Sequence, residues 1–379
     1  MEKIKDYDKI NKIIKEFNIS GDIFNIKLVN TGIINSTYKV MSNSNTEYLL
    51  QKINTNVFKD PYTLMKNIES VTNFIKENDS NNDSLTIIKT KQGKSLYVYK
   101  DEFLNKSYYR MFNYISNTVS YNNVDTLEIA YNIGKGFGHF QNVLRNYPVN
   151  LLKETIPNFH NTKIRYDNLI EAYKKAVPTR KSKVYKEIHE IISKRNKCSI
   201  IVDLLDKKKI PYRVTHNDTK ISNVLLDSKT KKPVAVVDLD TVMKGSCLYD
   251  YGDGIRSACS TALEDEKDLS KVSIDMEKFK AYTEGYLSEM APCLKPLEVE
   301  NMANSIKIIT LELAMRFLEH YLNGDTYFRT DYDEHNLVRA RNQLKLVKEI
   351  EEKMPQIKAF INECYKKYKG KAKSKRNSK

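Results

Sequence analysis

Residues 214–227 read VTHNDTKISNVLLD and place one His, one Lys and four Asp or Asn residues in a short span. Residues 233–242 follow as PVAVVDLDTV, an apolar run with two further carboxylates near its end. Taken singly, NDTK is typical of a turn and DLD is typical of a solvent-exposed strand end. Together, with a strand-like run between them, they predict a site at which several charged groups act on one ligand.

The spacing within this span is H-x-D-x-K-x-x-N, formed by His216, Asp218, Lys220 and Asn223. It is typical of the catalytic loop of kinase-like phosphotransferases. Transfer of a phosphoryl group from ATP needs an acceptor for the proton of the attacking hydroxyl, a cation beside the phosphoryl group and oxygen ligands for Mg²⁺. Asp218, Lys220 and Asn223 can supply these in that order, so we predict that Asp218 and Lys220 are catalytic.

Asp238 completes the predicted metal site. It lies fifteen residues after Asn223, at the end of the apolar run. Two adjacent strands would bring Asn223 and Asp238 to one ion, and hard oxygen ligands favour Mg²⁺, which binds through few protein groups plus the phosphates of a nucleotide. ATP and Mg²⁺ are therefore the predicted cofactors.

The chain before this span has a β-rich pattern. Residues 24–53 contain three short runs with turn residues between them, which predict three antiparallel strands. Asp60 and Pro61 are typical of a helix start, and apolar residues recur after them at three- and four-residue spacing. Further β-rich runs complete a predicted sheet of about five strands. Residues 1–117 are thus predicted to form a nucleotide-binding lobe with one helix.

The chain after residue 117 has a helical pattern. We predict a helical lobe over residues 118–365 that carries the catalytic loop and the substrate site, with one β-rich stretch at 212–238 and a long charged helix over about 333–365. A basic, disordered tail is predicted for residues 366–379. A small β-rich lobe followed by a larger helical lobe is the outline of the α+β, two-lobed protein-kinase-like fold.

The composition limits location and partners. About 40% of the residues are apolar, no run approaches the roughly 18 apolar residues of a membrane span, and the start, MEKIKDYDKI, lacks the apolar core of a signal peptide. The five cysteines include no C-x-x-C pair. These features predict a cytoplasmic protein with reduced cysteines and no membrane partner.

The formal net charge of +15 is concentrated at the C-terminus. Residues 366–379 hold seven Lys, one Arg and no acid, and without these eight charges the chain would carry +7. The sequence has no compact basic stripe interleaved with aromatic residues, so we expect no specific nucleic-acid partner. A weak attraction of the tail to RNA or another polyanionic surface stays open.

A glycine-rich segment, GKGFG at residues 134–138, invites a different interpretation. It falls within a helical pattern and lacks the G-x-G-x-x-G spacing after a strand that is typical of dinucleotide sites. Close packing between helices is therefore predicted there.

Several longer segments resemble a known family. They read NTGIINSTYKV, EYLLQKINTNVFKDPYTLMKNIE, YRMFNYISNTVSY, THNDTKISNVL, VVDLDTVMKGSCLYDYGDGIR and LELAMRFLEHYLNGDTYF, and they spread from about residue 30 to residue 328. The chain resembles the aminoglycoside phosphotransferase-like superfamily, which includes choline kinases and one class of homoserine kinases. Within it, the chain is most similar to the N-acetylhexosamine 1-kinase family.

The resemblance implies transfer of the γ-phosphate of ATP to the anomeric hydroxyl of N-acetylglucosamine or N-acetylgalactosamine. Asp218 would be the base that faces this hydroxyl, and Lys220 would steady the γ-phosphate. Arg316 and Tyr327 would contact the sugar, and Arg316 either points into the cleft or is neutralised by Glu312 one helical turn earlier. The preference between the two sugars and the oligomeric state stay open.

The same resemblance locates the phosphates of the nucleotide. The turn that carries Thr31, Ser36 and Thr37 takes the place of the nucleotide-covering turn, with one glycine where protein kinases have three. Its backbone N–H groups and hydroxyls are expected to bind phosphate. Gln51 occupies the slot of the ATP-binding lysine and Lys52 follows on the opposite strand face, and the choice between them stays open.

Two further parts of the nucleotide site follow from the resemblance. Glu69, on the next helix, is the candidate partner of the Gln51 slot, or else part of a solvent-exposed helix face. Adenine is expected to bind against the backbone of Asn113, Tyr114 and Ile115.

Two alternatives change what the site does. A kinase for choline, homoserine or an aminoglycoside would keep the chemistry, although a cationic acceptor calls for a cleft rich in carboxylates or aromatic rings. A nucleotide-binding pseudokinase is disfavoured because Asp218, Asn223 and Asp238 are all present. Asp250 and Asp253, in YDYGDGIR, are expected to be structural, Asp250 by bracing the catalytic loop.

Overall fold

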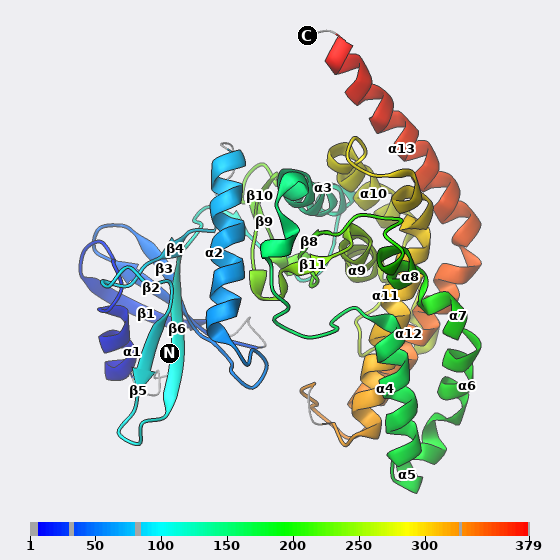
Figure 1. Ribbon diagram of the computed structural model, residues 1–379, viewed down its shortest axis with the longest axis horizontal. Helices are drawn as coiled ribbons and strands as arrows, with labels where there is room; N and C mark the ends of the chain where they lie inside the picture. The colour runs from blue at the N-terminus through cyan, green and yellow to red at the C-terminus, as the bar shows by residue number, and fades with distance from the viewer. Residues whose placement is uncertain (1–6, 30–33, 80–84, 326–327, 378–379) are drawn as a thin grey trace.

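The structure is a computed structural model, and it describes residues 7–29, 34–79, 85–325 and 328–377 (Figure 1). It has a small β-rich lobe followed by a larger helical lobe, so the predicted two-lobed kinase-like fold is confirmed. The first lobe consists of α1 (Tyr7–Ile14), β1 (Ile23–Val29), β2 (Ser36–Ser42), β3 (Glu47–Lys52), α2 (Pro61–Asn78), β4 (Ile87–Ile88), β5 (Tyr97–Lys100) and β6 (Lys106–Asn113).

The sheet of this lobe is antiparallel and has the order β1-β2-β3-β6-β4, with β5 also paired to β6. The three strands predicted for residues 24–53 are present, and the described sheet has six strands where about five were predicted. The prediction of one helix was wrong, because α1 precedes the sheet. Its apolar residues Ile10, Ile13 and Ile14 recur at helical spacing and are buried.

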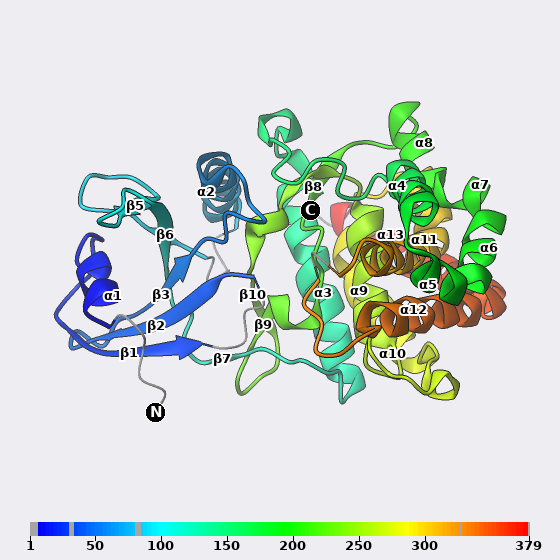
Figure 2. The same ribbon diagram turned by 90° about the horizontal axis from the view of Figure 1, so that it is seen from below.

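The two helices pack on opposite faces of the sheet (Figure 2). Side chains of a strand alternate between faces, so Leu50 lies in the core under α1 while Leu49 contacts the core under α2. Asp60 caps α2 by accepting hydrogen bonds from two backbone N–H groups of its first turn, as its position before Pro61 predicts. The α2 face of the sheet is the one turned toward the second lobe.

The second lobe is mainly helical. Its strands are β7 (Thr118–Val119), β8 (Arg213–Thr215), β9 (Val224–Asp227), β10 (Pro233–Val236) and β11 (Met243–Gly245), and they form the sheets β10-β9-β7 and β11-β8. Its helices are α3 (Leu127–Val143), α4 (Thr162–Lys175), α5 (Pro178–Lys181), α6 (Tyr185–Ser193), α7 (Arg195–Cys198), α8 (Ile200–Asp206), α9 (Cys247–Cys259), α10 (Met276–Met290), α11 (Pro296–Leu322), α12 (His335–Glu352) and α13 (Met354–Asn377). None of the helices described is long and apolar enough to cross a bilayer.

The C-terminal part differs from the prediction in two ways. The single helix predicted for residues 333–365 is divided between α12 and α13, because Pro355 lacks a backbone N–H and is accommodated in the first turn of a helix. The tail predicted to be disordered continues α13 to Asn377 and projects from the lobe (Figure 1). Lys dominates this stretch and is a good helix former.

The glycines of residues 134–138 allow α3 and α10 to pack closely, as predicted. A Cβ atom at Gly134 would overlap the backbone carbonyl of Tyr282, and one at Gly138 would lie 2.7 Å from the carbonyl oxygen of Tyr286. Gly285 on α10 approaches the carbonyl of Tyr131 on α3 in the same way. The two helices therefore meet backbone to backbone.

Substitution of Gly134 by Ala is expected to lower the free energy of unfolding by about 1–3 kcal/mol, because the added methyl group forces the two backbones apart. Urea denaturation followed by circular dichroism would measure it. The matched control is Gly370→Ala, at an exposed position of α13 with open space around it, where we expect no loss and up to about 1 kcal/mol of gain. Equal stability of Gly134→Ala and the wild type would contradict the close packing.

Candidate active site

The loop after β8 and the end of β10 bring the predicted catalytic and metal residues together. Asn223 ends a short 3₁₀ turn before β9, and Asp238 follows β10. Because β9 and β10 pair antiparallel, the two residues lie at the same end of this ladder, where the Val237 N–H donates to the Asn223 carbonyl at 2.9 Å. The two strands therefore end side by side at Asn223 and Asp238, as the predicted metal site requires, and the shared metal ion stays a prediction.

Two buried carboxylates at the start of α9 hold the catalytic loop. Asp250 accepts hydrogen bonds from the backbone N–H groups of His216 and Asn217 at 2.9 and 2.8 Å. Asp253 accepts one from the backbone N–H of Thr219 at 2.9 Å. The loop is thus fixed on both sides of Asp218, which is the bracing role expected for these residues.

His216 has a structural position behind the loop. Its side chain is buried, its Nε2 lies 2.9 Å from the Val237 carbonyl, and its Nδ1 accepts from the Asp218 N–H at 3.3 Å. The ring links the catalytic loop to the end of β10 and leaves Asp218, which is partly exposed, as the acid of the motif.

Asp218 and Lys220 are in contact. The Lys220 ammonium lies 2.8 Å from the Asp218 carboxylate. Burial disfavours the charge of Lys220, but the carboxylates of Asp218, Asp238 and Asp253 together outweigh it and raise the pKa of Lys220. The Asn223 amide nitrogen donates to the backbone carbonyl of Asp218 at 2.8 Å, which leaves the Asn223 amide oxygen for a metal ion.

Asp238 carries the carboxylate that was predicted to bind the metal ion. Its φ of 60° and ψ of 57° are left-handed, a conformation that costs a non-glycine residue energy and is common at functional sites. The side chain can be reached by solvent, but protein atoms surround it closely. This loss of hydration, together with the negative charges of Asp240 and Asp218, raises the pKa of Asp238 to about 6. A divalent cation would relieve this repulsion.

The donor set fits Mg²⁺. Among the described residues no three His, Cys, Asp or Glu side chains are arranged around a common metal position. Asn223 and Asp238 offer two hard oxygen donors, and Mg²⁺ binds through few protein groups when phosphate oxygens and water complete its shell. The site therefore suits a metal ion that arrives with a nucleotide.

A row of three side chains lies on the α2 face of the sheet above this loop. Thr37, Gln51 and Arg110 are direct neighbours across β2, β3 and β6. The Gln51 amide donates to the Thr37 hydroxyl at 3.2 Å and accepts from the Arg110 Nε at 3.0 Å. Ser36 and Lys52 belong to the opposite face, and Thr31 lies outside the described residues.

Sequence reasoning missed the partner of this row. The Arg110 side chain is buried, and its Nη1 lies 2.5 Å from the Oδ1 of Asp240. Asn35, next to β2, donates to the Oδ2 of Asp240 at 2.7 Å. The sequence offered two signals for this ion pair. Arg110 is a charged residue in the middle of the apolar run YYRMFNYI, and Asp240 is the second carboxylate of DLD.

The predicted role of Glu69 needs correction. Glu69 forms an ion pair with Lys89, near β4, and both side chains are about one-third exposed. Neither Gln51 nor Lys52 forms an ion pair or hydrogen bond with it in the described part of the chain. The geometry favours the other interpretation, in which Glu69 belongs to a partly exposed face of α2, because its ion-pair partner is Lys89.

The segment predicted to bind adenine connects the two lobes. The Asn113 N–H donates to the Thr86 carbonyl and the Tyr114 N–H to the Glu47 carbonyl, both at 3.0 Å. These two N–H groups are therefore occupied within the protein. Of the three predicted residues, Ile115 is the one whose backbone N–H has no hydrogen-bond partner in the described segments, which leaves it available for a ligand.

Arg316 lies between aromatic rings. Its guanidinium is 4.9 Å from the ring centre of Phe159 and 5.5 Å from that of Phe328. Glu312, the acid considered as its partner, instead lies 3.0 Å from His160. Arg316 forms no ion pair with any residue that the structure describes, and Tyr327 lies outside those residues.

The Arg316 cluster adjoins the catalytic loop. His160 follows Phe159 in the chain, and its Nε2 lies 3.4 Å from the carbonyl oxygen of Asn217, the residue before Asp218. The Phe159 ring that contacts Arg316 is therefore next to the loop that carries the proposed base. This places Arg316, a cation without an ion-pair partner in the part of the chain that the structure describes, near the catalytic loop.

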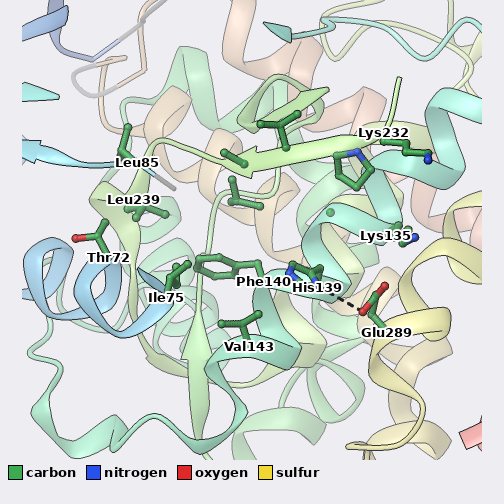
Figure 3. A pocket seen from close by; sticks show the side chains of 15 residues that line it. Thr72, Ile75, Leu85, Lys135, His139, Phe140, Val143, Lys232, Leu239 and Glu289 are labelled. Atoms are coloured by element: carbon green, nitrogen blue, oxygen red, sulfur yellow. Dashed lines mark hydrogen bonds and ion pairs between the residues drawn. The ribbon is translucent and has the colours of Figure 1, made fainter. Parts of the chain in front are cut away.

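A separate cavity of about 260 Å³ lies between α2, α3 and β10 (Figure 3). Apolar side chains such as Ile75 and Phe140 form much of its wall, and His139 and Glu289 lie near Lys135 on one side. None of the predicted site residues lines it. His139 also contacts Asp79 at the C-terminal end of α2, at 2.5 Å, so it links the two lobes.

The comparisons with known proteins agree with this geometry. The profile of the phosphotransferase enzyme family matches residues 25–268. A microcompartment-associated aminopropanol kinase is 14% identical, with a TM-score of 0.59 over 93% of this chain and 99% of that one.

Two further solved structures share the fold. An amicoumacin kinase, solved in complex with AMP-PNP, Ca²⁺ and its antibiotic, is 14% identical, with a TM-score of 0.58 over 92% of this chain and 94% of that chain. An aminoglycoside phosphotransferase from Alicyclobacillus acidocaldarius is 10% identical, with a TM-score of 0.62 over 92% and 95% of the two chains.

His139 is expected to make stability depend on pH. Hydrogen bonds to Glu289 and Asp79 raise the pKa of His139 against the effect of burial. A raised pKa in the folded state stabilises the fold fully below the unfolded value of about 6.5, and this stabilisation is lost as the pH rises through the folded pKa. His139→Gln should therefore lower the urea midpoint more at about pH 5.5 than at about pH 9.

The control for this experiment is His189→Gln. His189 packs on Tyr185 and forms no ion pair within the described chain. Its substitution should shift the urea midpoint by a similar small amount at both pH values. If His139→Gln lowers stability equally at both, the imidazolium does not hold the lobes together.

Proposed function

The chain belongs to the phosphotransferase enzyme family, and from this membership we propose that it uses ATP to phosphorylate the anomeric hydroxyl of an N-acetylhexosamine, giving the sugar 1-phosphate. The observation that carries the proposal is the contact of Asp218 with Lys220 in a loop fixed by Asp250 and Asp253. Such a loop holds a base and a cation in place before the substrates arrive.

The roles of the residues follow from their positions. Asp218 accepts the proton of the sugar hydroxyl as its oxygen attacks the γ-phosphorus. Lys220, released from Asp218, stabilises the oxygens of the transferred phosphoryl group. Asn223 and Asp238 would hold Mg²⁺, which neutralises charge on the phosphates when bound. The structure of the amicoumacin kinase with AMP-PNP and Ca²⁺ supports a nucleotide and a divalent cation as ligands of this fold.

The charge on the acceptor side supports an uncharged acceptor. Arg316 forms no ion pair with a described residue and lies beside Phe159, next to the catalytic loop. A guanidinium can donate hydrogen bonds to sugar hydroxyls or to an acetamido carbonyl, whereas it repels an ammonium group. The aromatic rings of Phe159 and Phe328 suit the apolar face of a sugar ring. A sugar therefore fits better than an amino alcohol.

A cationic acceptor is the second candidate. The aminopropanol kinase and the aminoglycoside phosphotransferase with the same fold are named for amine-bearing substrates. The catalytic loop would serve such an acceptor equally well, because only the hydroxyl enters the chemistry.

An assay of the purified protein with Mg-ATP separates these candidates. N-acetylglucosamine, N-acetylgalactosamine, galactose, choline, homoserine and kanamycin are offered singly, and ADP release and loss of the reducing end are measured. ADP release with loss of the reducing end on the N-acetylhexosamines is the expected result. Turnover only on choline, homoserine or kanamycin would show that the acceptor is not an N-acetylhexosamine. ATP binding without transfer to any of the six compounds would favour a pseudokinase.

Asp218→Asn is expected to lower kcat by about 100-fold or more, because the amide cannot take up the proton. ATP affinity and the melting temperature should change little, since the backbone of the loop is held by Asp250. Asp227→Asn, at the end of β9 where the side chain accepts a hydrogen bond from the Thr230 N–H of the following turn, is the matched control and should keep full activity. Near wild-type turnover by Asp218→Asn would remove this residue from the mechanism.

Arg316→Gln is expected to raise the KM for the sugar by about tenfold, equivalent to about 1.4 kcal/mol, while the KM for ATP stays constant. The control is Arg341→Gln, which removes an arginine of α12 that is paired with Glu187 of α6. It should change neither KM. A KM for the sugar that is unchanged in Arg316→Gln would mean that the acceptor binds elsewhere.

A further inference from the structure

We propose that Arg110 supplies the positive charge for the α- and β-phosphates of the nucleotide, and that Asp240 holds it in place before the nucleotide binds. This inference rests on the proposed function only in requiring ATP as the phosphate donor. It does not depend on the identity of the acceptor.

The first argument is position. Gln51 occupies the slot from which a lysine reaches the phosphates in related kinases, and it is uncharged. Arg110 is its direct neighbour on β6, with the Arg110 Nε 3.0 Å from the Gln51 Oε1. The Arg110 guanidinium therefore lies just beyond the end of the Gln51 side chain. A positive charge on a side chain of β6 would thus replace the positive charge that a lysine on β3 provides in related kinases.

The second argument is that the other candidates are already used or point away. The Gln51 amide donates to Thr37 and accepts from Arg110, so both ends are engaged. Lys52 lies on the face of β3 that carries Leu50 and packs toward α1. Of Gln51, Lys52 and Arg110, only Arg110 combines a positive charge with the face turned toward the catalytic loop.

The third argument concerns the burial of the charge. Arg110 is only 1% exposed and Asp240 only 4% exposed. The Asp240 Oδ1 lies 2.5 Å from the guanidinium, in an ion pair without hydrogen-bond geometry, and accepts no hydrogen bond from a described residue. A buried charge of this kind is stable only when paired. The pair thus keeps a desolvated cation at the site until a second anion arrives.

The fourth argument links this cation to the metal site. Asp240 lies two residues after Asp238 in the same short turn. Of the guanidinium nitrogens, Nε donates to Gln51 and Nη1 lies against Asp240 and the Met65 sulfur, so Nη2 has no partner among the described residues, and the planar fork of a guanidinium matches phosphate oxygens. Phosphates bound to a metal at Asp238 would therefore lie near the free edge of the Arg110 guanidinium.

The test is titration calorimetry of adenosine, ADP and ATP, each with Mg²⁺, into the full chain. Arg110→Gln should weaken ADP and ATP binding by at least about tenfold, while adenosine affinity is unchanged, because adenosine has no phosphate to lose. Lys52→Gln is the control and should bind all three as the wild type does. Addition of Gln51→Lys to the Arg110→Gln variant should restore most of the lost ADP and ATP affinity.

Asp240 provides a check on folding. Arg110→Gln leaves the Asp240 carboxylate buried without its partner, so the double variant Arg110→Gln with Asp240→Asn removes the orphaned charge. It should melt closer to the wild type and still show the selective loss for phosphate-bearing ligands. Unchanged ADP and ATP affinity in this double variant, or an equal loss for adenosine, would overturn the proposal and leave Arg110 with a structural role.

The outcomes also separate this inference from the proposed function. Selective loss of ADP and ATP binding, with no turnover of N-acetylhexosamines by the wild type, would support Arg110 and reject the sugar acceptor. If the wild type turns over the sugar and Arg110→Gln keeps full ADP and ATP affinity, the sugar acceptor is supported and the role of Arg110 is rejected. A wild type that binds none of the three ligands would overturn both.

Discussion

The hydrogen bonds from the catalytic loop to Asp250 and Asp253 are the constraint on which the site depends. Backbone N–H groups in a loop normally face water, and here three of them face buried carboxylates on α9. This arrangement fixes the direction of the Asp218 side chain without using any side chain that must contact a substrate. It also explains why α9 begins directly below the loop, since both carboxylates come from its first two turns.

The local parts of this arrangement could be predicted from the sequence. The motif around Asp218, the apolar run before Asp238 and the glycines of α3 each have a pattern with a physical reason, and the structure shows the corresponding loop, strand and helix contact. The first helix carried the same kind of signal in Ile10, Ile13 and Ile14, which was overlooked. The division of the last long helix was likewise marked by Pro355.

The contacts between distant segments could not be predicted in this way. Nothing in the sequence near Arg110 shows that Asp240 will lie beside it, because 130 residues separate them and the pairing depends on how two lobes meet. The same holds for Glu312, where helical spacing allowed Arg316 as one possible partner and the structure provides His160. Spacing predicts neighbours within one element, whereas partners across elements depend on the assembled fold.

The contacts between the lobes also bear on how the protein can move. Asn67 of α2 donates to backbone carbonyls of residues 153 and 242, His139 contacts Asp79, and Arg110 contacts Asp240. The backbone contact of α3 with α10 makes the helical lobe a rigid block, so a hinge motion must occur around the segment after β6. Because the contacts listed above all cross this hinge, opening of the cleft requires that several break at once, and domain opening should resemble a switch between two states more than gradual flexing.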